Sequence, residues 1–149
     1  MDKQYPFKDS PQLVFHKEYV SIHLLEAQSL LLLEWKRQIS MEERKVGFQE
    51  ALAFTHKNQI SRWLVDDLQL YIITAEEKEW ILTQFQEEAS KSPLLKLAVV
   101  TADFYPSLVV NTEFTEKTKE GYEAKGVIQH EVFTDYASAL HWLLPDREV

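Results

Sequence analysis

The sequence contains no cysteine. Disulfide bonds, thiolate catalysis and cysteine-based zinc sites are therefore excluded, and the composition is typical of a reducing cytoplasm. Only 3 glycines and 5 prolines occur among the 149 residues. The glycines are too far apart to form a phosphate-binding loop, which excludes the common nucleotide-binding motifs. The length and the scarcity of linker residues predict one domain over residues 1–149, with residues 1–11 as a flexible N-terminal segment.

Long apolar runs and an excess of positive charge are absent as well. The longest apolar run, Leu30–Leu33, is far shorter than a membrane span, and Met1–Pro6 has neither the basic region nor the apolar stretch of a signal peptide. The formal net charge of −8 argues against nucleic-acid binding, which requires clustered Lys and Arg. We therefore expect a cytoplasmic protein with no transmembrane segment and no nucleic-acid partner.

The pattern of apolar residues predicts alternating strands and helices. Strands are expected at residues 12–19, 20–25, 29–37, 60–65, 95–101 and 127–133, and helices at 40–56, at 75–90, from 103 and from 135. Ser40 with Glu43, and Thr74 with Glu77, form capping boxes that predict two of the helix starts. The first strands are joined too tightly for crossover helices. The predicted fold class is therefore α/β, with a mixed, mostly parallel central sheet of about 5–6 strands, an antiparallel N-terminal edge and about four helices.

Two details of this architecture follow from single segments. The runs Leu30–Leu33 and Leu97–Val100 contain no polar residue to face water, so both strands should lie in the interior of the sheet. Gly121 and Gly126 are expected to bracket a turn before the last strand. The last helix should begin at Asp135, which can cap it.

A resemblance to a known family rests on four short stretches: Leu33-Glu-Trp35, Ser40-Met-Glu-Glu43, Trp63-Leu-Val-Asp66 and Phe133-Thr-Asp-Tyr-Ala-Ser-Ala-Leu-His-Trp-Leu143. Together with the order of elements, they resemble small bacterial STAS-like proteins, whose SpoIIAA-like fold is shared with the lipid-binding CRAL-TRIO group. The resemblance covers roughly residues 12–144. It implies a non-enzymatic regulatory or protein-interaction module. The relation to CRAL-TRIO domains implies the alternative, a carrier or sensor of a small apolar ligand or lipid.

One departure from the family pattern concerns regulation. Anti-sigma-factor antagonists of the STAS family carry a phosphorylatable Ser just beyond the strand that matches Trp63–Asp66, typically as Asp-x-Ser. Here the matching residues are Asp66-Asp67-Leu68, so the hydroxyl is missing. Thr74, the next candidate for the phosphorylated residue, is explained by helix capping. We therefore predict that the module works without the phosphorylation switch of the family.

The acidic pair Asp66-Asp67 lies where a strand ends before a helix, a common position for binding sites in α/β proteins. Neighbouring residues of a strand point in opposite directions, so the pair should not form a shared-proton dyad, and a metal would need further ligands from elsewhere. We expect a solvated strand end and assign no catalytic residue, no metal and no cofactor. An enzyme that uses Asp66 or Asp67 is the second alternative.

The loop that follows, Leu68–Ile73, is more apolar than a solvated turn requires. We expect some of its side chains to pack under the following helix and the remainder to form an exposed or semi-exposed apolar patch beside the acidic pair, with Tyr71 as its anchor. Changing Tyr71 to Ala or Leu70 to Asp should leave the fold intact and remove binding. Trp142 lies off the apolar stripe of the last helix, so it should cover a sheet edge or lie in a homodimer contact. The predicted partner- or ligand-binding residues are Asp66, Asp67, Leu68, Leu70, Tyr71 and Trp142.

Overall fold

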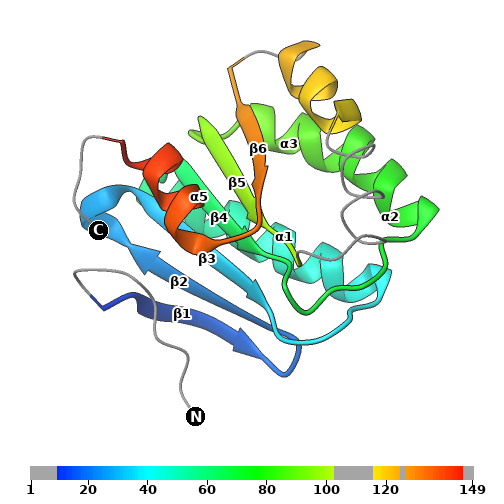
Figure 1. Ribbon diagram of the computed structural model, residues 1–149, viewed down its shortest axis with the longest axis horizontal. Helices are drawn as coiled ribbons and strands as arrows, with labels where there is room; N and C mark the ends of the chain where they lie inside the picture. The colour runs from blue at the N-terminus through cyan, green and yellow to red at the C-terminus, as the bar shows by residue number, and fades with distance from the viewer. Residues whose placement is uncertain (1–9, 103–115, 125–126, 146–149) are drawn as a thin grey trace.

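The computed structural model describes residues 10–102, 116–124 and 127–145. Within these residues, six strands form one sheet whose order in space follows the order in the chain. The strands are β1 (Gln12–Lys17), β2 (Val20–Leu25), β3 (Leu30–Trp35), β4 (Arg62–Asp66), β5 (Lys96–Val100) and β6 (Gln129–Phe133). Strands β1 to β3 are antiparallel and β3 to β6 are parallel (Figure 1). The predicted α/β class, with a mixed sheet and an antiparallel N-terminal edge, is confirmed.

The helices begin where the capping residues predict. Ser40 and Glu43 form a complete capping box at the start of α1 (Met41–Asn58), and Thr74 and Glu77 form another at α2 (Ala75–Trp80). Helix α2 continues through the π-helical turn η2 (Ile81–Phe85) into α3 (Gln86–Ser90), and Asp135 caps α5 (Tyr136–Leu143). A short 3-10 turn, η1 (Glu26–Gln28), joins β2 to β3, and residues 116–124 are also helical. The helix predicted from Asp103 starts outside the described residues, as does most of the segment 1–11.

Two apolar cores lie on the two faces of the sheet. Helices α1, α2 and α3 cover one face and α5 covers the other (Figure 1). Because successive side chains of a strand alternate between faces, Leu31 and Leu33 of β3 belong to the first core, whereas Leu30 and Leu32 belong to the second. Strands β3 and β5 both have strands on either side, which confirms that the two apolar runs are interior strands.

Gly121 does not lie in the turn that the sequence suggested, because it is part of the helical segment 116–124. A Cβ atom at this position would lie 2.1 Å from Oε1 of Gln86 in α3. A side chain at this position would therefore displace the Gln86 amide, whose Nε2 donates to Thr118 O at 3.0 Å. Gly126, the other end of the predicted turn, lies outside the described residues.

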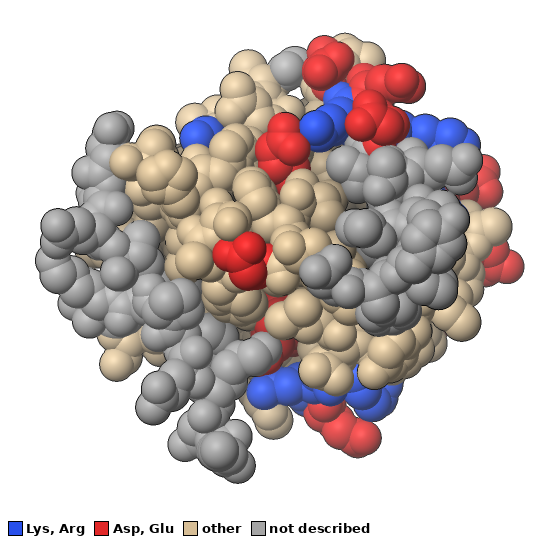
Figure 2. Space-filling model, viewed as in Figure 1, with Lys and Arg blue, Asp and Glu red and all other residues tan. Residues whose placement is uncertain are grey.

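The face of the molecule that carries α5 has charged side chains mainly along its rim, whereas mostly uncharged residues form its middle (Figure 2). Lys and Arg do not form a continuous patch in this view. No helix in the described part of the chain is both long and apolar enough to cross a membrane.

Candidate functional site

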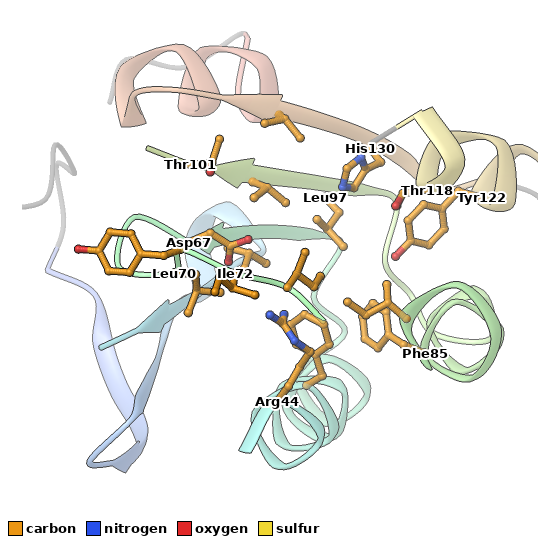
Figure 3. Close-up of a pocket in the computed structure, with 17 residues that line it drawn as sticks. Arg44, Asp67, Leu70, Ile72, Phe85, Leu97, Thr101, Thr118, Tyr122 and His130 are labelled. Atoms are coloured by element: carbon orange, nitrogen blue, oxygen red, sulfur yellow. The ribbon is translucent and has the colours of Figure 1, made fainter. Parts of the chain in front are cut away.

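A cavity of about 80 Å³ lies beneath the loop that follows β4 (Figure 3). Its walls come from the first-core face of β4, β5 and β6, from α1 and η2, from the loop, and from residues 116–124. One buried water needs roughly 10–15 Å³ of such space, so the cavity is several times larger than a single water site. Most of its lining side chains are apolar, and the polar exceptions are Arg44, Asp67, Tyr71, Thr101, Thr118, Tyr122 and His130.

The acidic pair is divided between the two faces of the sheet, as neighbouring strand residues predict, but Asp66 is not solvated. Asp66 is completely buried on the α5 side. Its Oδ1 accepts a hydrogen bond from the backbone N–H of Leu68 at 2.9 Å, and its Oδ2 accepts one from the hydroxyl of Tyr136 in α5. The expectation of a solvated strand end is therefore wrong for Asp66. Its position and partners give it a structural role, which is to tie β4 to α5.

Asp67 points to the other face and lines the cavity. Its backbone is held in place, because its N–H donates to Val100 O at 2.8 Å and its carbonyl accepts from Leu70 N at 3.0 Å. Its Oδ1 is buried and has no hydrogen-bond partner within the described residues. Burial raises the pKa of Asp67 from 3.8 to about 7; Arg44 opposes this rise, and the Asp66 and Glu77 carboxyls add to it. Of the two aspartates, only Asp67 is therefore placed for proton transfer inside the cavity.

Arg44 contributes the positive charge of the site and is 2% exposed. Its Nε donates to Oε2 of Glu77 at 2.6 Å, so a buried ion pair joins α1 to α2. Burial alone would raise the pKa of Glu77, but the hydrogen bond and charge of Arg44, with the backbone of Thr74, hold this pKa below its ordinary value. Replacing one residue of such a pair leaves the other charge buried without a counter-charge, which strongly destabilises the fold.

Sequence reasoning missed Arg44 and Glu77, although a signal for Arg44 was present. Arg44 precedes Gly47, Phe48 and Ala51 by three, four and seven positions, so it lies on the buried stripe of the predicted helix. A charged residue on such a stripe needs a buried partner. The identity of that partner depends on how α1 and α2 pack, which the sequence pattern does not reveal.

The other end of the cavity is formed by Thr118, Tyr122 and His130 (Figure 3). The rings of Tyr122 and His130 are stacked, with centroids 6.0 Å apart. Burial, together with the positive charge of Lys119, lowers the pKa of His130 to about 4, so the imidazole is neutral near pH 7. Burial also raises the pKa of Tyr122, so its phenol keeps its proton. This end of the cavity is therefore polar but uncharged.

The loop Leu68–Ile73 is partly buried and partly exposed, as its composition predicts. Tyr71 and Ile72 are 64% and 66% exposed, but Leu70 is 7% exposed and belongs to the first core, and Leu68 packs against the second. The expectation that Leu70 can become Asp without loss of the fold is therefore wrong, because the carboxylate would be buried. Leu70 and Tyr71 both line the cavity, as does Asp67.

Gln38, which sequence reasoning also missed, holds this loop in place. Its side-chain oxygen accepts from Tyr71 N at 2.8 Å and from Ile72 N at 3.2 Å, and its amide nitrogen donates to Ile72 O at 2.8 Å. Three hydrogen bonds from one side chain therefore fix the exposed part of the cavity wall.

Trp142 lies at the α5 side of the sheet, away from the cavity. It is half-buried against Phe133 at the end of β6, with ring centroids 5.9 Å apart. The Lys96 ammonium lies 4.9 Å from the centre of its ring and donates to its carbonyl at 2.9 Å. Trp142 therefore covers the end of an edge strand, and its predicted homodimer contact stays a prediction.

In the described residues, no group of three or more His, Asp or Glu side chains is arranged to hold a metal ion. The resemblance to STAS-like proteins stays a prediction, because no family model, no curated protein and no solved structure matches this chain.

Proposed function

We propose that this domain binds a small, mainly apolar ligand in the cavity and acts as its carrier or sensor. The observation that carries this proposal is the cavity itself, which combines an apolar lining with a few polar atoms at two ends. Small-molecule sites in proteins have this composition, and in α/β folds they lie at the carboxyl ends of strands. The loop after β4, which supplies Asp67 and Leu70, occupies this position.

The test is to fill the cavity and measure the loss of binding. Toluene is a suitable probe because it is apolar, uncharged and small, and its binding can be followed by NMR chemical-shift titration. Val99 is half-buried in β5 and lines the cavity, so Val99→Phe should fill it and weaken toluene binding at least roughly tenfold. The matched control is Val46→Phe on the exposed side of α1, which should leave binding unchanged. Equal binding by both variants would contradict the proposal.

Native mass spectrometry of protein purified from its own cells addresses the ligand directly. We expect a retained small molecule that leaves when the protein is denatured. The Val99→Phe variant should carry less of it than the Val46→Phe variant, because only the first change reduces the cavity.

A second candidate, the protein-interaction module, is favoured by the exposure of Tyr71 and Ile72. Two neighbouring large apolar side chains, each about two-thirds exposed, are more than a turn requires. If this patch joins two copies of the chain, sedimentation will show a dimer that a Tyr71→Ser, Ile72→Ser double variant converts to monomer. Monomer alone at high micromolar concentration would exclude self-association through this patch.

A further inference from the structure

Three buried polar atoms of residues that line the cavity have no hydrogen-bond partner within the described residues. Nδ1 of His130 lies at the end with Tyr122. The other two are Nη2 of Arg44, which can only donate, and Oδ1 of Asp67. Nearly all buried polar atoms of folded proteins are hydrogen-bonded, so each exception calls for an explanation. Here the Arg44 donor and the Asp67 acceptor are complementary and face one cavity.

The Arg44 guanidinium lies over the rings of Trp35 and Phe48, but within the described part of the chain no hydrogen bond reaches either atom. Nε of Arg44 is already used by Glu77, and both backbone hydrogen-bonding groups of Asp67 are engaged. The two unpartnered atoms do not bond to each other, although Figure 3 shows both side chains directed into the same part of the cavity. Leu70 and Ile72, which line the same part of the cavity, are apolar and offer no side-chain hydrogen bond. A single group placed between the two atoms would satisfy both.

The charges nearby limit what that group can be. Arg44 and Glu77 neutralise each other as a buried pair. An ammonium group at this position would lie against the Arg44 guanidinium, and a carboxylate would lie against the carboxyls of Asp67 and Glu77. Burying either without a full counter-charge is unfavourable. An uncharged group is therefore preferred.

We infer that the ligand carries an uncharged head group that donates a hydrogen bond to Asp67 and accepts one from Arg44, as a hydroxyl or a primary amide can. This inference rests on the proposed function, because it names the polar end of the apolar ligand. The apolar body of the ligand would extend toward Leu97 and Val99, away from the two polar side chains. The preferred ligand is thus a small alcohol or amide with an apolar body, and neither an acid nor an amine.

The test uses five probes that share one ring and differ only in the head group: toluene, benzyl alcohol, benzamide, benzoate and benzylamine. Their dissociation constants are measured by NMR titration at one pH, with the wild-type protein and with Asp67→Leu. Leu has the same branched arrangement of four side-chain heavy atoms as Asp but provides no hydrogen-bonding atom. We expect benzyl alcohol or benzamide to bind wild-type protein roughly tenfold tighter than toluene, and benzoate and benzylamine to bind more weakly than toluene.

The variant should bind toluene as well as the wild-type protein does but should lose the preference for the head group. Toluene binding by the variant is therefore the control for an intact cavity. If this variant does not fold, the wild-type series is sufficient by itself. It compares the probes with an uncharged head group with the charged probes and with toluene, which has no polar head group.

Three results would overturn the inference and leave the proposed function standing: equal binding of all five probes, tightest binding of benzoate or benzylamine, or an unchanged preference in Asp67→Leu. Failure of every probe, toluene included, would instead overturn the proposed function together with this inference.

Discussion

Replacing Asp67 by Asn should stabilise the protein at high pH, although it removes a charge next to Arg44. The reason is that the Asp67 carboxyl is buried without a hydrogen-bond partner for Oδ1 within the described residues. Its ionised form is therefore poorly solvated. Asn has the shape of a protonated Asp and cannot ionise, so it avoids this cost.

The size and direction of the effect follow from the two pKa values. Burial raises the pKa of Asp67 from 3.8 to about 7, so between these pH values the folded protein holds a proton that the unfolded chain has released. The free energy of unfolding therefore falls as the pH rises through this window. A difference of about three pH units corresponds to about 4 kcal/mol, which is the largest stabilisation that Asp67→Asn can provide at pH 8. At pH 4 the two proteins should be nearly equal in stability.

Urea unfolding followed by tryptophan fluorescence, at a series of pH values from 4 to 8, measures this difference. Other groups titrate in the same range, so the informative quantity is the difference between wild type and variant at each pH. Glu88→Gln, which removes an exposed carboxylate from α3, is the control and should show no such trend. An Asp67→Asn variant that is no more stable than wild type at pH 8 would refute the reasoning.

Three further changes test other contacts. Gly47→Ala should destabilise the fold by about 1–3 kcal/mol in urea unfolding, although Ala normally favours helices, because its Cβ would lie 2.4 Å from the Trp35 ring. Tyr136→Phe should cost about 1–3 kcal/mol in the same assay by removing a hydrogen bond to the buried Asp66. Tyr71→Ala should leave the unfolding midpoint nearly unchanged, because this side chain is mostly exposed.

The fold could be predicted from the sequence because its signals are local. The alternation of apolar residues, the capping boxes at Ser40 and Thr74 and the continuous run Leu30–Leu33 each act within a few positions of the chain. They were sufficient to place the strands and to predict the antiparallel edge. The prediction failed where a local signal has two meanings, because a glycine can indicate either a turn or a close contact. Gly121 indicates a turn by its sequence, but in the fold it lies in a helix and contacts Gln86, which is distant in the sequence.

The site could be located but not described from the sequence. The end of β4 was singled out correctly as a position of interest, but the burial of Asp66 depends on Tyr136, which follows it by 70 residues. In the same way, the environment of Asp67 depends on Arg44 in α1 and Glu77 in α2. Such partners meet only through tertiary packing, so the sequence pattern alone carries no information on whether the two carboxylates are solvated or buried.

The second core has a consequence for synthesis on the ribosome. Because the strands pair in the order in which they are made, the sheet can grow by adding each new strand to its predecessor. The row formed by Leu30, Leu32 and Leu64, however, is covered by α5, which follows all six strands in the chain. Until α5 has emerged, a nascent sheet presents this row to the surrounding proteins, and contiguous exposed apolar surface of this kind promotes aggregation. The nascent chain should therefore depend on chaperones until its last helix is complete.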